Sequence, residues 1–113
     1  MPSEKSEVAD GTLVVRVARD GDTEVIALCG ELDLANAGTA EAALQGSLAA
    51  ARSVIVDMRE LEFIDSTGIA MLVASLNGDD GDSRISFIPS TAPAVSRVLE
   101  LTGLAERMPL ADA

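Results

Sequence analysis

The hydroxyl and carboxyl groups of residues 65–68, Asp-Ser-Thr-Gly, are the first candidates for chemistry in this sequence. They precede a run of mostly small and apolar residues at helical spacing, IAMLVAS. Asp65 or Ser66 would cap such a helix, because a side-chain oxygen at a helix start accepts hydrogen bonds from unpaired backbone N–H groups. The same helix start also favours a phosphate, whose charge the helix dipole stabilises. Ser66 is therefore either a helix-start residue or a phosphate site.

Ser66 lacks the general base that a catalytic serine needs. The chain of 113 residues contains no histidine, and its one lysine, Lys5, lies in the polar N-terminal segment. A serine nucleophile requires a group that removes the hydroxyl proton, and only carboxylates are left for this role. We therefore predict that the chain is not an enzyme and that Ser66 is suited to being a substrate.

Cofactor and metal binding lack their usual residues as well. The nine glycines form neither a phosphate-binding loop ending in Gly-Lys-Ser/Thr nor a dinucleotide fingerprint, so we expect no nucleotide and no other cofactor. Cys29 is the only cysteine, which excludes an internal disulfide and, without histidine, a thiolate and imidazole metal site. Cys29 lies between Leu28 and Gly30 in a predicted strand. We therefore interpret it as a small buried apolar residue rather than a redox sensor.

Two further acidic positions have alternative interpretations. The loop from Asp79 to Asp82 contains hard oxygen ligands, but its spacing does not match a calcium loop, and we interpret it as a solvated turn. Asp57 ends a predicted strand, where the aspartate of a response-regulator receiver would accept a phosphate. A receiver also needs a late lysine, and this chain has none after Lys5. We therefore expect no metal site and no receiver.

The charge of the chain favours a protein partner. Nineteen acidic and eight basic residues give a formal net charge of −11, which repels both phosphate backbones and anionic membranes. Two phenylalanines are the only aromatic residues, too few for base stacking. The N-terminus lacks a signal-peptide pattern, and no apolar run approaches the roughly 20 residues of a membrane span. We expect a cytoplasmic protein that binds neither nucleic acid nor membranes directly.

Hydrophobic patterning predicts one α/β domain. A hairpin over 12–20 and 23–32 precedes a helix over 33–51 with Asn36 as its cap, a central strand over 53–58 and a helix reaching about Asn77. A strand over 84–90 and a helix ended near Gly103 follow, with a possible short strand at 107–110. Residues 1–10 are expected to be a flexible tail, and 11–113 the domain.

This order of elements places the candidate residues together. We expect a mixed, mostly parallel sheet of four to five strands, with the helices packed mainly on one face. If the second and third of these strands are parallel neighbours, Asp33 and residues 65–68 meet at one rim of the sheet, where open α/β sheets tend to place functional sites. Gly30 and Gly68 would allow the loop and the helix to approach closely.

Three segments resemble those of the STAS domain, in particular of bacterial anti-sigma factor antagonists. They are GELDLANA, VIVDMRELEFIDSTGIAMLV and AVSRVLELTGLAERM, and the resemblance extends over residues 12–110. It implies that Ser66 is phosphorylated by a serine kinase that is also the anti-sigma factor. It further implies that the unphosphorylated protein binds this kinase and releases the sigma factor for transcription, and that a phosphatase reverses the switch.

The resemblance also assigns the partner-binding residues. Asp33 matches the acid of the first loop and Asp65 the motif acid; with Ser66, Thr67 and Gly68 they form the predicted contact site. Thr67 is the rival phosphate acceptor, one residue along the same turn. Some STAS domains are instead constitutive subunits of transporter ATPases, and this second function stays open. The acidic segment NGDDGDS departs from the basic stretch common in the antagonists and leaves open how this face meets a kinase.

Overall fold

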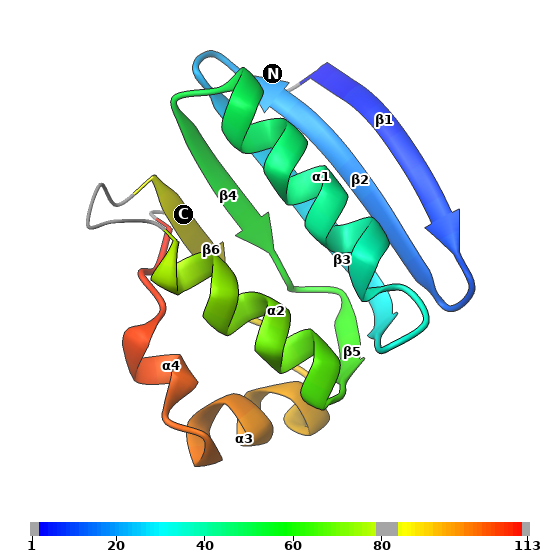
Figure 1. Ribbon diagram of the computed structural model, residues 1–113, viewed down its shortest axis with the longest axis vertical. Coiled ribbons are helices and arrows are strands. Elements are labelled where there is room, and N and C mark those ends of the chain that lie inside the picture. The colour runs from blue at the N-terminus through cyan, green and yellow to red at the C-terminus, as the bar shows by residue number, and fades with distance from the viewer. Residues whose placement is uncertain (1–2, 79–83, 112–113) are drawn as a thin grey trace.

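The computed structural model describes residues 3–78 and 84–111. Strands and helices follow one another along the chain as a mixed α/β fold (Figure 1). The elements are β1 (Ser3–Asp10), β2 (Leu13–Asp20), β3 (Thr23–Leu32), α1 (Ala37–Ala50), β4 (Ser53–Asp57), β5 (Leu61–Ile64), α2 (Ser66–Asn77), β6 (Ile85–Ile88), α3 (Pro93–Leu101) and α4 (Leu104–Arg107).

One mixed sheet of six strands organises the described residues. The strand order is β1-β2-β3-β4-β6, and β5 also pairs with β3. The β1–β2 and β2–β3 pairs are antiparallel, whereas β3–β4, β3–β5 and β4–β6 are parallel. Helices α1 and α2 lie on one face of this sheet, in front of the strands in Figure 1. The predicted fold class is confirmed, although the sheet has more strands than the four to five expected.

The first additional strand is β1, which corrects the expected flexible tail. Ser3–Asp10 pair with β2 along their length, from Ser3 opposite Arg19 to Asp10 opposite Leu13. The segment SEKSEVAD gives almost no hydrophobic signal, because an edge strand buries few side chains; even Val8 is 48% exposed. Backbone hydrogen bonds instead provide the pairing, together with the ion pair between Glu7 and Arg16 at 2.7 Å.

The second additional strand is β5. β3 pairs with β4 over its first half and with β5 over its last three residues. Beyond the end of β4, β5 is therefore the parallel neighbour of β3. The sequence RELEF has three charged residues in five positions and therefore reads as a loop. The first and last residues of β5, Leu61 and Ile64, are nevertheless buried, and they fix the strand against the core.

The remaining predicted elements agree with the structure, with local differences. Helix α2 ends at Asn77, as expected, and α3 ends two residues before Gly103, which adopts a left-handed conformation and is followed by the short α4. Residues 107–110 contribute an isolated parallel bridge between Leu110 and Phe87 rather than a strand. The acidic loop from Asp79 to Asp82 lies outside the described residues.

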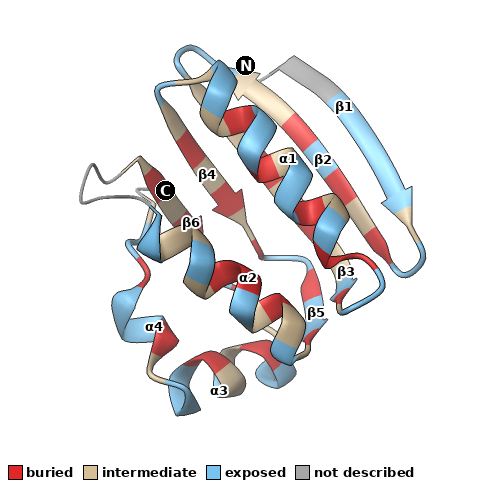
Figure 2. Ribbon diagram, viewed as in Figure 1, coloured by how far each residue is buried: buried red, intermediate tan, exposed pale blue. Residues whose placement is uncertain are grey.

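The core lies between the sheet and its helices. Buried and less buried residues alternate along β2, β3, β4 and β6, and one helical stripe each of α1 and α2 is buried (Figure 2). The buried side chains are almost all aliphatic, with Phe87 as the one buried aromatic residue among those described. In the described residues, no helix is both long enough and apolar enough to cross a membrane.

Candidate functional site

The end of β3 and the start of α2 meet at one rim of the sheet. The Asp65 backbone N–H donates to the Leu32 carbonyl at 3.1 Å, and the Leu34 N–H donates to Asp65 Oδ2 at 3.1 Å. The two bonds connect the loop that contains Asp33 to the residue that precedes α2. The predicted meeting of Asp33 with residues 65–68 is therefore present, and it follows from the parallel pairing of β3 with β5.

The Asp65 carboxylate is the central acceptor of this rim. Its Oδ1 accepts from the backbone N–H groups of Thr67 at 2.9 Å and Gly68 at 3.0 Å, which caps α2. Its Oδ2 accepts from Leu34 in the neighbouring loop. One carboxylate thus satisfies two helix-start donors that would otherwise lack partners and also fixes the loop. Asp65 is a positioning residue for the whole rim.

Ser66 and Thr67 differ in their access to solvent. Ser66 is the first residue of α2 and is exposed, whereas Thr67 is half-buried. Because the cap comes from Asp65, no hydrogen bond of the described helix start depends on the Ser66 hydroxyl. The structure therefore separates the two roles considered for this segment: Asp65 caps, and Ser66 stays accessible.

The loop between β3 and α1 is held by its own hydrogen bonds. Asp33 Oδ1 accepts from the Ala35 N–H at 3.0 Å, while the Asp33 N–H donates to Asn36 Oδ1 at 2.9 Å. Asn36 is buried, and its Nδ2 donates to the Glu31 carbonyl at 2.9 Å. Asn36 thus occupies the predicted cap position of α1, but its side chain bonds within the loop and makes no capping bond. This network places Asp33 beside the start of α2.

Two glycines allow close approaches near this rim, and one of them, Gly68, lies between α2 and the sheet. Gly30 has a φ of +102°, and a Cβ there would collide with the backbone carbonyl of Thr12. A Cβ on Gly68 would lie 2.7 Å from Ile64 Cγ1 and 2.9 Å from Leu32 Cγ. The first turn of α2 therefore packs directly on β3 and β5 at Gly68, as predicted, whereas Gly30 allows the approach of Thr12, before β2, and not that of the helix.

The rim also contains two exposed apolar residues that sequence reasoning missed. Leu34 is 77% exposed and directly follows Asp33, and Phe63 on β5 is 43% exposed. An apolar patch rimmed by polar groups is typical of a contact surface, and these two residues are the exposed large apolar side chains of the rim. The predicted helix over 33–51 includes Leu34, so the sequence contained no sign of its exposure; Phe63 was marked only by being one of two aromatic residues.

The charge of the rim is negative. Segments 30–36 and 60–68 contain five acidic residues and no basic residue.

Asp57, the residue that resembled a receiver aspartate, lies outside the rim. It accepts hydrogen bonds from the Arg59 guanidinium at 3.0 and 2.8 Å. Burial alone would raise the pKa of Asp57, but the side-chain and backbone hydrogen bonds from Arg59 outweigh it, so the pKa lies below its usual value.

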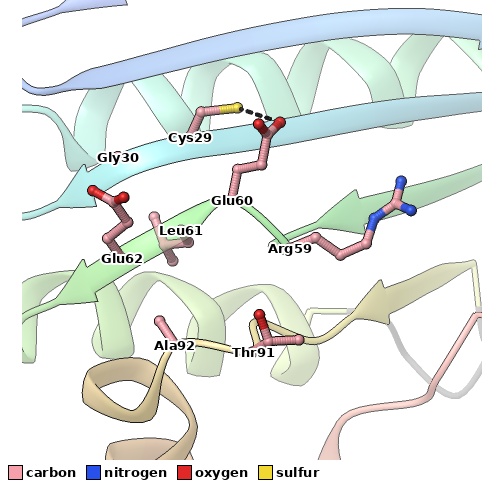
Figure 3. A pocket seen from close by; sticks show the side chains of 8 residues that line it. All are labelled: Cys29, Gly30, Arg59, Glu60, Leu61, Glu62, Thr91 and Ala92. Atoms are coloured by element: carbon pink, nitrogen blue, oxygen red, sulfur yellow. Dashed lines mark hydrogen bonds between the residues drawn. The ribbon is translucent and has the colours of Figure 1, made fainter.

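Cys29 lies away from the helix-covered face, in a hollow of about 510 Å³ (Figure 3). It is half-buried, rather than buried as expected, and its thiol donates to Glu60 Oε2 at 3.6 Å. Partial burial raises the pKa of the Cys29 thiol, and the negative charge of Glu60 raises it further. A thiol with a raised pKa is a poor nucleophile at neutral pH.

Comparison with known families and structures gives consistent matches. The family model described as "Mlab, STAS domain" matches residues 15–111. A crystal structure of an anti-sigma factor antagonist from Mycobacterium paratuberculosis is 24% identical, with a TM-score of 0.79, and the match covers 93% of this chain and 90% of that one.

Two structures of one further protein are similar. The unphosphorylated anti-sigma factor antagonist SpoIIAA is 23% identical, with a TM-score of 0.69 and coverage of 87% of this chain and 88% of that one. The phosphorylated form, named as a Bacillus cell fate determinant, is 22% identical, with a TM-score of 0.61 and coverage of 87% and 91%. At these identities the structures show a shared fold. A comparison with curated protein sequences gives no match.

Proposed function

The chain belongs to the STAS domain family, and from that premise we propose that it is an anti-sigma factor antagonist controlled by phosphorylation of Ser66. In this proposal the unphosphorylated protein binds an anti-sigma factor that is a serine kinase, so that the sigma factor is released in the cytoplasm. Phosphorylation of Ser66 ends the contact, and a phosphatase restores it. The observation that carries the proposal is the exposed Ser66 at the start of α2, held beside the Asp33 loop by Asp65.

Accessibility supports Ser66 over Thr67 as the phosphate acceptor. A kinase must bring its own ATP to the hydroxyl, and the exposed Ser66 can enter another protein's active site without unfolding of α2. Thr67 is half-buried, and its N–H is bound by Asp65. SpoIIAA, a protein of similar structure, has been solved in phosphorylated and unphosphorylated forms. This similarity supports the proposal that the present chain is phosphorylated as well.

Electrostatics explains how a phosphate would end the contact. A phosphoserine adds about −1.5 to −2 charges. The helix start tolerates this charge, but Asp33 and Asp65 belong to the same acidic rim, and a partner that fits a neutral hydroxyl would have to desolvate the dianion. A loss of roughly 3 kcal/mol would weaken binding about a hundredfold. No rearrangement of the fold is needed.

The rim also indicates the kind of partner surface that fits. Leu34 and Phe63 would act as apolar anchors, because exposed large side chains near the centre of an interface contribute most of the binding energy. The surrounding carboxylates of Asp33 and Asp65 would face basic residues of the kinase. Such charge pairs accelerate association at low salt, so binding should weaken as the salt concentration rises.

A parallel capture experiment tests this function. Wild-type protein, Ser66→Glu and Gln45→Glu serve as baits in a lysate of the native host, and the retained proteins are identified by mass spectrometry. Gln45 is exposed on α1, so Gln45→Glu adds the same charge away from the rim. We expect wild type and Gln45→Glu to retain an ATP-binding serine kinase that Ser66→Glu loses. Retention of the same kinase by all three baits would contradict the switch.

The family model supports a second candidate function. It is described by the name Mlab, and some STAS domains are constitutive subunits of transporter ATPases. In that case the rim would be a permanent contact and Ser66 only a helix-start residue. The same experiment separates the two functions, because all three baits would then retain a transporter ATPase.

A further inference from the structure

Asn36 departs from the usual behaviour of a residue at a helix start. Asn is a favoured helix cap, but the Asn36 side chain makes no hydrogen bond to the first turn of α1, and that turn contains no acidic residue either. The side chain is nevertheless removed from water, since Asn36 is only 1% exposed. Departures of this kind from local preference are expected at functional sites.

Both polar atoms of the Asn36 side chain hold the preceding loop instead. Oδ1 accepts from the Asp33 N–H at 2.9 Å, and Nδ2 donates to the Glu31 carbonyl at 2.9 Å. Among the common capping residues Asn, Asp, Ser and Thr, only Asn carries an acceptor and a donor on two different atoms. The two bonds therefore explain why an amide, rather than any capping residue, stands at this position.

The loop between β3 and α1 is fixed at three points (Figure 1). The Asp33 carbonyl accepts two backbone N–H groups, at 3.1 and 2.8 Å, and closes a turn. The Asn36 side chain connects this turn to β3, and Asp65 connects it to the start of α2 through the Leu34 N–H. The Leu34 side chain itself is 77% exposed. The loop thus holds the backbone of Leu34 in place and presents its side chain to solvent.

We propose that Asn36 is a positioning residue that sets the affinity of the rim for its protein partner. A partner that binds a mobile loop must order it, and this loss of conformational freedom reduces the affinity. A loop that is already held avoids the loss, so Asp33 and Leu34 meet the partner without rearrangement. The inference rests on the rim being the contact surface, as in both candidate functions above, and not on phosphorylation of Ser66.

Amide hydrogen exchange of the purified full chain, followed by NMR, tests the positioning without a partner. Asn36→Ser removes the side-chain bond to β3 and supplies a good helix cap, so the chain should stay folded. Ser47→Ala is the matched control: it removes a buried bond between α1 and β3, about three turns further along the helix. The Leu34 and Ala35 N–H groups have acceptors outside Asn36, and we expect them to exchange about tenfold faster in Asn36→Ser only.

Isothermal titration with the purified partner tests the effect on affinity. The partner is the protein that the wild-type bait retains in the capture experiment, either the kinase or the transporter ATPase. We expect Asn36→Ser to bind it about tenfold more weakly than wild type, and Ser47→Ala to bind like wild type. Urea denaturation of both variants accompanies the titration, because a merely structural role would change affinity only in proportion to stability.

Three results overturn the proposal: wild-type exchange of the loop amides in a folded Asn36→Ser, wild-type affinity of that variant, or wild-type affinity of Leu34→Ala, which would place the contact elsewhere. If Asn36→Ser does not fold, the nearly isosteric Asn36→Asp, which lacks the Nδ2 donor, takes its place under the same criteria. Weaker binding of Asn36→Ser to a partner that Ser66→Glu retains would contradict the phosphorylation switch and support the positioning role. The two proposals therefore fail separately.

Discussion

Asp65 has two separable roles at the scale of a single residue. Oδ1 caps α2 through Thr67 and Gly68, and Oδ2 holds the neighbouring loop through Leu34. A capping role alone would be met by any short polar side chain. The loop contact needs a second acceptor oxygen, which only a carboxylate provides in this position. The geometry of the rim therefore explains why an acid begins the Asp-Ser-Thr-Gly segment.

Substitutions at Asp65 separate these roles. Asp65→Ala removes all three hydrogen bonds, and we expect it to lower the free energy of unfolding by about 2 kcal/mol. Asp65→Asn keeps a capping oxygen but places an amide N–H₂ against the Leu34 N–H, for an expected loss of about 1 kcal/mol. Urea denaturation of both variants and wild type measures the difference. Equal losses would show that the cap contributes nothing, contrary to the structure.

The residue scale is also where sequence reasoning was most effective. Asp65 and Ser66 could be singled out as candidates at the start of α2, because hydroxyls and acids at a helix start are local features that the printed sequence displays. The exposure of Leu34 and Phe63 could not be predicted, because it depends on which neighbours the fold brings near. A single leucine has the same sequence signal in a core and on a surface. Cys29 is half-buried because it lies on the side of the sheet that α1 and α2 do not cover, and the sequence did not indicate this either.

At the scale of the element, Gly68 determines how closely α2 approaches the sheet. A Cβ at this position would lie within 3 Å of both Ile64 and Leu32, and these are buried side chains. The first turn of α2 would have to move outward to accommodate it. That turn carries Ser66, so the packing of the element and the position of the candidate phosphate acceptor are coupled.

A pair of glycine substitutions tests this packing. Ala favours a helix over Gly by about 1 kcal/mol, and Gly46→Ala on α1, with no atom within 4 Å of the new Cβ, should gain up to about that amount. Gly68→Ala should instead lose roughly 1 to 3 kcal/mol, because overpacking outweighs the helix preference. Thermal and urea unfolding of both variants give the comparison. A stabilised Gly68→Ala would mean that α2 does not pack this closely.

The elements that were not predicted share one physical cause. β1 and β5 have charged sequences, and their pairing comes from backbone hydrogen bonds with β2 and β3, which no pattern of apolar residues reveals. The elements with a buried stripe, such as α2 and the β2–β3 hairpin, were predicted within a few residues. Hydrophobic periodicity thus identified the strands and helices that build the core. It missed β1 at the edge of the sheet and β5 at the end of β3.

At the scale of the whole molecule, charge and surface divide the protein into distinct sides. The rim at the start of α2 is acidic with exposed apolar residues, whereas Arg16 and Arg59, elsewhere in the chain, are paired with Glu7 and Asp57. The rim is therefore suited to a basic partner. A net charge of −11 was evident from composition, but its uneven distribution follows only from the fold.

The central claim is that a phosphate on Ser66 ends the contact with the kinase. Isothermal titration of the captured kinase with unphosphorylated protein, and with protein carrying phosphoserine at position 66, measures it directly; phosphoserine in place of Gln45 is the control. We predict that phosphoserine at position 66 weakens binding about a hundredfold, or roughly 3 kcal/mol, and that the control binds like the unphosphorylated protein. Equal affinity of all three forms would contradict the account.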